Sequence, residues 1–189
     1  MKVLCEVSVR HVHLTQTDLE ILFGKGAKLE FERALSQPGQ FLSKQRVTLI
    51  GPKREIENVA ILGPVRSASQ VEIARTDAFT LGIKDVPLRQ SGDVAGTPGI
   101  VLKNGSKTIG LTQGVIVAKR HVHFDTKTAH ENGFYDGEIV NIILGGERGG
   151  VFNKTVVRVH DNFAPAIHID SDEGNAMFAE TQAEVQKCK

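Results

Sequence analysis

Two histidine pairs are the part of this sequence whose residue types and spacing could do chemistry. His11 and His13 are separated by one valine, and His121 and His123 repeat that spacing. In an extended strand residues i and i+2 point to the same face, so each pair presents two imidazoles side by side. Two such nitrogen ligands suit zinc, which needs a third protein ligand and can leave a fourth position open for chemistry. The spacing therefore predicts two metal sites.

Glu72 and His168 are the candidates for the third ligand of each site. Each lies between two aliphatic residues in an alternating, strand-like run, Gln70–Ile73 and Ala166–Ile169. A carboxylate or an imidazole in such a run needs a partner if its face is buried. Imidazoles with one carboxylate favour zinc, although cobalt, nickel and iron accept the same ligands.

The segments that carry the histidine pairs are copies of one unit. Residues 7–15 align with residues 117–125, and both contain a β-branched run, the tetrapeptide Arg-His-Val-His and a polar stretch that can start a helix. The predicted short helices cover 18–23 and 127–132. The candidate N-caps are Thr15 or Thr17 in the first copy and Asp125 or Thr126 in the second. A repeat of this kind indicates a duplicated structural unit.

The rest of the chain reads as short strands that must hold these residues in place. Runs rich in Val, Ile and Thr are separated by Gly-Pro, Asn-Gly, Asp-Gly and Gly-Gly turns, a pattern typical of barrels or sandwiches. Residues 145–150 are expected to form a hairpin loop, and only 183–189 could be a tail. The predicted strands are 45–50, 56–62, 99–101, 106–110, 115–118, 138–144 and 154–159.

Composition excludes several classes of protein. With 23 Lys and Arg against 22 Asp and Glu, the formal net charge is +1, which gives no general reason to bind nucleic acid or an anionic membrane. No run approaches the roughly 18 apolar residues of a spanning helix, and the N-terminus does not resemble a secretory signal. A cytoplasmic location is therefore expected. Cys5 and Cys188 do not suggest a disulfide framework.

Three arginines are candidates for anion binding. Arg66 lies in a turn-rich stretch six residues before Glu72, and its planar guanidinium matches two oxygens of a phosphate. Arg10 and Arg120 precede the histidine pairs. Each could either contact phosphate or form an ion pair that positions the metal-binding strand. The remaining histidines, His130 and His160, are expected to have a solvated or structural role.

The ordered motifs of this chain resemble those of the phosphate propanoyltransferases, phosphotransacylases associated with bacterial microcompartments. The resemblance covers about residues 3–178. Its motifs are Val-Ser-x-Arg-His-Val-His-Leu at 7–14, Leu-Ser-Gln-Pro-Gly-Gln-Phe at 35–41, Leu-Gly-Pro-Val-Arg with Gln-Val-Glu-Ile within 62–73, Ser-Gly-Asp-Val-Ala-Gly-Thr-Pro-Gly at 91–99, Arg-His-Val-His at 120–123 and His-Ile-Asp-Ser-Asp-Glu-Gly-Asn-Ala at 168–176.

The resemblance implies a mainly β fold of two closed β-barrels from the duplicated unit, capped by short α-helices. The first barrel would combine 1–10 with 118–189, and the second would span 11–117. Two zinc ions would lie between the barrels, one held by His11, His13 and Glu72 and the other by His121, His123 and His168. Arg66 matches the family's phosphate-binding arginine, and Ser8 and Asn175 fall where the family contacts coenzyme A.

The implied activity is the interconversion of a short-chain acyl-CoA plus phosphate with acyl phosphate plus CoA. Propanoyl and acetyl groups differ by one methylene, which the sequence does not resolve. The partners would be small-molecule substrates, further copies of the chain in a homo-oligomer, and microcompartment enzymes. Members enclosed in microcompartments usually carry an N-terminal extension, whereas here the first strand is expected at about residue 3. The microcompartment lumen therefore stays open as an alternative to the expected cytoplasmic location.

Two other functions fit the same histidines. A two-metal hydrolase of phosphate esters or thioesters would use hydroxide instead of phosphate as its nucleophile. A non-catalytic protein would use the histidine clusters only to hold the two barrels together. Phosphate-dependent release of CoA, and the effect of replacing Arg66, separate these functions from the transferase.

Overall fold

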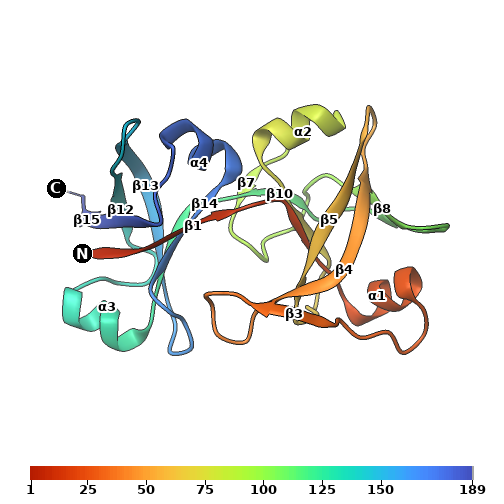
Figure 1. The fold of residues 1–189 in the computed structure, drawn as a ribbon, viewed down its shortest axis with the longest axis horizontal. Coiled ribbons are helices and arrows are strands. Elements are labelled where there is room, and N and C mark those ends of the chain that lie inside the picture. The colour runs from red at the N-terminus through yellow and green to blue at the C-terminus, as the bar shows by residue number, and fades with distance from the viewer. Residues whose placement is uncertain (189) are drawn as a thin grey trace. The chain divides into compact units, whose positions relative to one another are not determined.

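The computed structural model describes residues 1–188 and is built mainly from strands, with four short helices (Figure 1). The final residue, Lys189, belongs to the predicted segment 118–189 and lies outside the described residues. The strands are β1 (Lys2–Ser8), β2 (His11–His13), β3 (Phe31–Ala34), β4 (Phe41–Ile50), β5 (Glu55–Gly63), β6 (Gln70–Glu72), β7 (Leu88–Arg89), β8 (Ile100–Asn104), β9 (Lys107–Leu111), β10 (Val115–Ala118), β11 (His121–Phe124), β12 (Ile139–Leu144), β13 (Gly150–Val159), β14 (Ala166–Asp170) and β15 (Gln182–Lys187). The helices are α1 (Gln16–Phe23), α2 (Arg75–Leu81), α3 (Thr126–Asn132) and α4 (Ser171–Met177).

The chain divides into two compact units. Unit 1 comprises Met1–Val9, Ser36–Pro38 and the described residues from Lys119 onward, and unit 2 comprises Arg10–Leu35 and Gly39–Ala118. That the predicted segments 1–10 plus 118–189 and 11–117 fold as separate domains remains a prediction.

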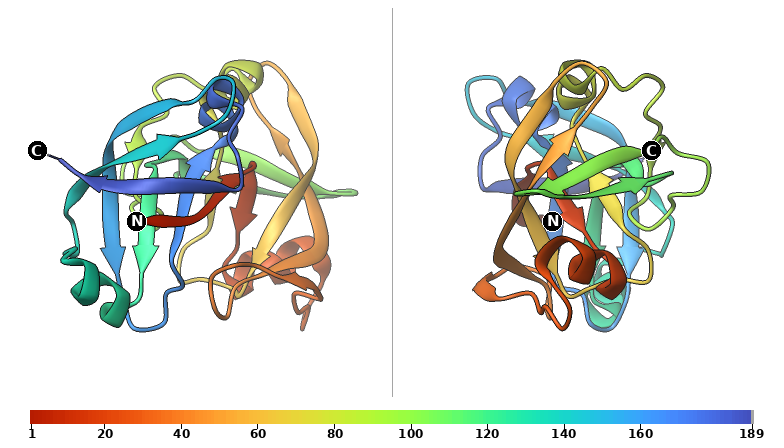
Figure 2. Two further views of the ribbon diagram at one scale, coloured as in Figure 1. Left: turned by 60° about the vertical axis from the view of Figure 1, so that its left-hand side comes forward. Right: turned by 90° about the vertical axis from the view of Figure 1, so that its right-hand side faces the viewer.

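Unit 1 is a closed barrel with the strand order β1-β14-β11-β13-β12-β15. The first and last strands meet because β1 pairs parallel with β14 and antiparallel with β15. Figure 2 shows these two terminal strands side by side. Alternate residues face inward along each strand, and Val3, Val122, Val140 and Ile167 are among those that fill the barrel core.

Unit 2 is a curled, open sheet with the order β7-β10-β6-β2-β5-β4-β8-β9, and β3 pairs with β4 at its side. Its core includes Val12, Leu49, Ile61 and Leu102, with Leu19 of α1 packed against them. The expected mainly β fold and one closed barrel are confirmed. In unit 2 the described strand pairings leave the end strands β7 and β9 unjoined, so the second closed barrel is not shown.

Each unit contains the same local succession, and this places the histidines. A strand with the His-x-His pair leads into a short helix, and a later strand with the third candidate ligand leads into another. Of the candidate N-caps, the first of each pair is the one observed: Thr15 accepts a hydrogen bond from the amide of Asp18 (3.1 Å), and Asp125 accepts one from that of Thr128 (2.8 Å). The two predicted helices are confirmed, but α1 begins two residues and α3 one residue earlier than predicted.

Two segments for which the sequence predicts no helix are nevertheless helical. They form α2 and α4, which begin directly after the third-ligand strands and have only seven residues each. An acid at the third helical position, Asp77 or Glu173, accepts a hydrogen bond from the backbone N–H of the residue that precedes the helix. A helix this short gives little periodic signal, since packing and capping stabilise it more than propensity does.

The C-terminal segment also differs from its interpretation as a tail. Residues 183–187 belong to β15, and Ala183 and Val185 of this strand are buried in the barrel core. The predicted hairpin loop is confirmed: residues 145–149 join β12 and β13, which pair antiparallel, and Gly150 already belongs to β13. None of the helices in residues 1–188 is long and apolar enough to cross a membrane.

Candidate metal centres

Unit 2 brings His11, His13 and Glu72 together. The pairing of β2 with β6 is antiparallel and places His11 directly opposite Glu72. The Nε2 atoms of His11 and His13 lie 3.6 and 3.8 Å from the two carboxylate oxygens of Glu72. One ligand atom from each of the three residues can be chosen so that all lie within 4.8 Å of one another, and all three residues are buried. This is a separation that one metal ion can span.

Polar side chains hold the Glu72 carboxylate in place. Ser91 donates a hydrogen bond to Oε1 of Glu72 (2.7 Å), and Gln70 donates one to the same oxygen (2.6 Å). Gln70 is itself fixed, because its Oε1 accepts a hydrogen bond from the amide of Gly92 (2.6 Å). Partners of this kind orient a metal ligand and tune its basicity.

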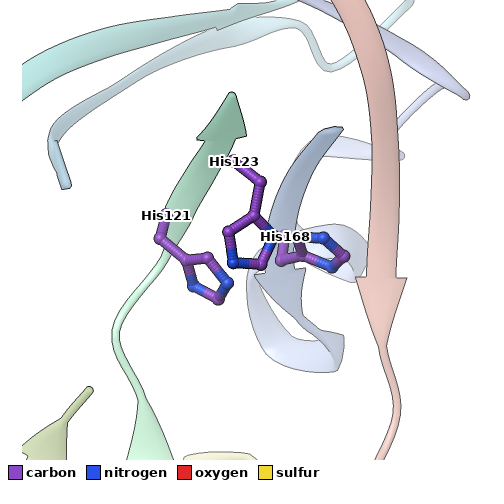
Figure 3. Close-up of side chains that lie close together, drawn as sticks. All are labelled: His121, His123 and His168. Carbon is purple, nitrogen blue, oxygen red and sulfur yellow. The ribbon is translucent and has the colours of Figure 1, made fainter. Parts of the chain in front are cut away.

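Unit 1 brings together the three candidate ligands of the second site. His121 and His123 project from β11 and His168 from the neighbouring β14, and their rings converge (Figure 3). The antiparallel register places His121 opposite His168, the same relation that His11 has to Glu72. The ring centroids lie 4.6 to 5.1 Å apart, and the chosen ligand nitrogens lie within 4.8 Å of one another.

The protonation states of His13, His123 and Glu72 suit a metal. Burial, followed by the nearby charge of His11, lowers the pKa of His13 well below its usual range. Burial, with the charges of His121 and His168, lowers the pKa of His123 to about 2. For Glu72 burial raises the pKa, but the charge and hydrogen bond of His11, with His13 and Ser91, outweigh it and hold the pKa well below its usual value. Neutral imidazoles and an ionised carboxylate are the forms that bind metal.

Two observations test the fit of a metal to the second group. The Nδ1 atom of His121 lies 2.8 Å from the carbonyl oxygen of Lys119, which can only accept a hydrogen bond. His121 therefore carries its hydrogen on Nδ1 and presents the lone pair of Nε2. The Nδ1 atom of His123 is buried without a hydrogen-bond partner in the described part of the chain, which is costly unless something else binds there. Both observations fit zinc, whose ligands are neutral imidazole nitrogens.

Arg66 belongs to the same network as Glu72. It is half-buried in the segment between β5 and β6, and its Nη1 donates a hydrogen bond to Ser91 Oγ (3.0 Å). The same Oγ donates to Glu72, so one hydroxyl joins the candidate phosphate-binding arginine to a candidate metal ligand. The sequence pointed to Arg66 by its nearness to Glu72 along the chain; the connection itself passes through Ser91.

Ser8 and Asn175, expected to contact coenzyme A, lie in one region of unit 1. Ser8 ends β1 and pairs with Asp170, the residue that caps α4. Asn175 lies within α4 and is exposed. β1 and α4 pack closely against each other. Gly174 of α4 lies so near Val7 of β1 that a Cβ atom added to the glycine would be 2.7 Å from a methyl carbon of the valine.

Sequence reasoning missed Ser91 and Gln70, although the family motifs at 62–73 and 91–99 contain both residues. Their role depends on contacts with Glu72 that only the fold provides, since Ser91 lies 19 residues beyond it. His130 and His160 are exposed and join neither group, in agreement with a solvated or structural role. His160 Nδ1 accepts a hydrogen bond from the amide of Asn162 (3.2 Å).

Comparison with known proteins gives a consistent result. A family model described as phosphate propanoyltransferase matches residues 4–180. A phosphate propanoyltransferase of Thermotoga maritima is 48% identical over 180 residues, which cover 95% of this chain and 85% of that protein. Those of Listeria monocytogenes (48%, covering 90% of this chain and 80% of that protein) and Rhodopseudomonas palustris (44%, covering 97% and 80%) are similar over nearly the same length. This chain belongs to the phosphate propanoyltransferase family.

Proposed function

We propose that this chain is a phosphate acyltransferase that interconverts a short-chain acyl-CoA plus phosphate with acyl phosphate plus CoA, using two zinc ions per chain. Membership of the family makes it an acyltransferase. The observation that carries the proposal is the pair of three-residue groups, each with ligand atoms within 4.8 Å of one another. His11, His13 and Glu72 would hold one zinc, and His121, His123 and His168 the other.

The chemistry requires three things of the site. An oxygen of phosphate attacks the thioester carbonyl carbon, a C–O bond forms, the C–S bond breaks and CoA leaves as a thiolate. Zinc, when bound, supplies positive charge that stabilises an oxyanion and a thiolate near neutral pH. The chain itself must bind phosphate, hold the acyl-CoA and bring the two together, since positioning can lower the barrier by several kcal/mol.

Arg66 is proposed to bind the phosphate. A guanidinium carries N–H donors in a planar fork that matches two oxygens of a phosphate. The hydrogen bond to Ser91 Oγ (3.0 Å) fixes where that fork lies, and the hydrogen bond from Ser91 to Glu72 relates it to the candidate metal ligand. The phosphate is thereby presented in a set orientation.

Ser8 and Asn175 are proposed to contact coenzyme A. Support comes from their positions at the end of β1 and on α4, two elements that contact each other in unit 1. Propanoyl-CoA is the proposed substrate, with acetyl-CoA as a second one, because a single methylene gives little discrimination in an apolar pocket.

We also propose a dinuclear zinc centre, a homo-oligomer, a cytoplasmic location with contact to microcompartment enzymes, and closure of the unit 2 sheet, each of which can be measured. If the two zinc ions form one dinuclear centre, two cobalt ions that replace them should show magnetic coupling to each other. A homo-oligomer would be seen by light scattering. A cytoplasmic location and contact with microcompartment enzymes would be seen by cell fractionation and co-purification. Closure of the second sheet into a barrel would give amide exchange protection at β7 and β9.

The test is a thiol-release assay with propanoyl-CoA and zinc-loaded protein. The proposal expects CoA release that requires phosphate and yields propanoyl phosphate in equal amount. Release that is independent of phosphate would contradict it and indicate the hydrolase. Arg66→Ala should lose turnover while it keeps its fold and zinc; a chain without phosphate-dependent activity at any zinc loading would point to the non-catalytic alternative.

A further inference from the structure

Arg10 and Arg120 occupy equivalent positions in the two units, and both bind an acid on the helix after the third-ligand strand. Nε and Nη2 of Arg10 lie 2.8 and 2.7 Å from Oδ1 of Asp77 on α2. Nη1 of Arg120 donates a hydrogen bond to Oε1 of Glu173 on α4. The same pairing therefore occurs twice, once with an aspartate and once with a glutamate.

The acid serves two purposes in both pairs. Oδ2 of Asp77 accepts a hydrogen bond from the amide of Ala74 (3.1 Å), and Oε2 of Glu173 accepts one from the amide of Asp170 (3.1 Å). One carboxylate oxygen thus holds the first turn of the helix, and the other holds the arginine. The arginine, the helix start and the end of the third-ligand strand become one rigid connection.

This connection lies next to the candidate ligands. Arg10 immediately precedes His11, and Asp77 follows Glu72 by five residues, while His11 and Glu72 face each other in the register of β2 and β6. The two strands share three register pairs, and His11 with Glu72 is the pair at one end of this ladder. The ion pair closes this short ladder at the end where His11 and Glu72 lie.

Unit 1 has the same arrangement with additional anchors. Arg120 precedes His121, which faces His168, and Glu173 follows His168 by five residues. Nε and Nη2 of Arg120 also donate to the carbonyl oxygen of Asn153 on β13, at 3.0 and 2.8 Å. The strand that carries His121 is thereby tied to both of its neighbours.

Burial indicates what these guanidinium groups do. The Asp77 side chain is 6% exposed and that of Glu173 is 19% exposed, so each carboxylate needs its cation. An arginine engaged in this way with a buried acid is a poor phosphate ligand, because release of the acid would leave a buried charge without its partner. Of the two roles that the sequence left open for Arg10 and Arg120, the structure favours positioning over phosphate contact.

We propose that Arg10 and Arg120 are positioning residues. Each holds the first histidine and the third ligand of the candidate metal site in its own unit at coordination distance. The inference rests on the proposed zinc binding. Each arginine affects only the candidate metal site of its own unit. Loss of a group that hydrogen-bonds a metal ligand directly lowers metal affinity by roughly 10- to 100-fold, and we expect an effect of this order for these arginines.

The experiment measures zinc affinity in protein that retains a single site. His123→Ala leaves the unit 2 site, and Glu72→Ala leaves the unit 1 site. Each background receives Arg10→Gln or Arg120→Gln, and metal-free protein is titrated with zinc against a chromophoric chelator, well below its unfolding temperature. Arg10→Gln should weaken the unit 2 site by roughly 10- to 100-fold and leave the unit 1 site unchanged, and Arg120→Gln should do the reverse.

A matched control and a conservative variant separate positioning from general stability. Glu32→Gln breaks another ion pair of unit 2, in which Arg46 Nη2 lies 2.7 Å from the carboxylate, and should leave zinc affinity unchanged. Arg10→Lys keeps the charge but not the two-nitrogen contact, and should recover part of the affinity. If Arg10→Gln does not fold, Arg10→Lys and Asp77→Asn, whose amide oxygen can still cap α2, carry the test.

The outcomes distinguish the two proposals. Variants with lower unfolding temperatures but unchanged zinc affinities would overturn the positioning role, as would equal weakening of both sites by one substitution. A parent protein without two tight zinc sites would instead overturn the proposed function.

Discussion

His11 and Glu72 face each other across the antiparallel pair of β2 and β6, with Nε2 of the histidine 3.6 Å from the carboxylate. His121 and His168 have the same relation across β11 and β14. The duplicated unit therefore retains one arrangement, a His-x-His strand beside a third-ligand strand, while the chemical nature of the third ligand differs. Carboxylate and imidazole both bind zinc, so geometry is the shared property of the two sites.

Replacement of Glu72 tests this equivalence. Glu72→Ala removes the only carboxylate of the unit 2 group, and zinc content should fall from two ions per chain to one, with activity at least about 100-fold lower. Glu72→His copies the ligand that unit 1 has at this position and should restore most of the second zinc. Elemental analysis of purified protein measures both. Two zinc ions in Glu72→Ala would refute the assignment of this ligand.

Ser91 should matter for phosphate more than for stability. Its hydroxyl accepts a hydrogen bond from Arg66 (3.0 Å) and donates one to Glu72 (2.7 Å), so Ser91→Ala releases both residues. We expect KM for phosphate to rise by roughly 10-fold, an effect of about 1.4 kcal/mol, close to the lower end of what one hydrogen bond to a charged group contributes. Steady-state kinetics at saturating propanoyl-CoA measures it. Ser106→Ala, at an exposed turn, is the control; an unchanged KM for phosphate in Ser91→Ala would remove Ser91 from the site.

The candidate ligands could be predicted from the sequence because their signal is local. His-x-His in a strand fixes the direction of two imidazoles, and the repeat identifies the pairs as related. Glu72 and His168 were found as polar residues between aliphatic ones. Ser91 carries no such local mark, since a serine in a glycine-rich loop is usually solvated. Its contacts with Arg66 and Glu72 arise only when segments 19 and 25 residues apart fold together.

The topology was less accessible for a similar reason. Alternation of residue types predicts strands, but the parallel pairing of β1 with β14 joins residues more than 150 positions apart. Polar residues in 183–188 resemble a tail, yet Ala183 and Val185 face the barrel and are buried. Strand order and closure depend on such long-range pairings, which composition and periodicity do not encode.

Arg66→Lys tests whether phosphate is held by geometry or by charge alone. Lysine keeps the positive charge but is a point donor, so it cannot match two phosphate oxygens in a plane. KM for phosphate should rise by roughly 10- to 100-fold, while KM for propanoyl-CoA changes less than about 2-fold. Arg54→Lys, at an exposed position of the same unit, should be silent. An equal rise in both KM values would show that Arg66 does not act on phosphate specifically.

Ionisation of the buried Cys5 thiol should lower the free energy of unfolding at alkaline pH. Burial, followed by the charges of Glu6 and Glu173, raises the pKa of its thiol from 9.0 to about 11. Below pH 9 the thiol is protonated in both folded and unfolded chains, so it adds no pH dependence. Above pH 9 the unfolded chain ionises first, and the free energy of unfolding should fall by about 2 to 3 kcal/mol by pH 11 and then level off.

Denaturant unfolding of the parent protein and of Cys5→Ala, compared from pH 7 to 11, isolates this contribution. The difference in free energy should be constant below pH 9 and change between pH 9 and 11. Cys188→Ala, which removes the exposed thiol, is the matched control and should follow the parent curve.

A thiol reagent at pH 8 should modify Cys188 in the native protein and Cys5 only after unfolding, because the buried thiol is inaccessible and remains protonated. Rapid modification of both thiols in the native protein would show that Cys5 is not held in the barrel core as the structure has it.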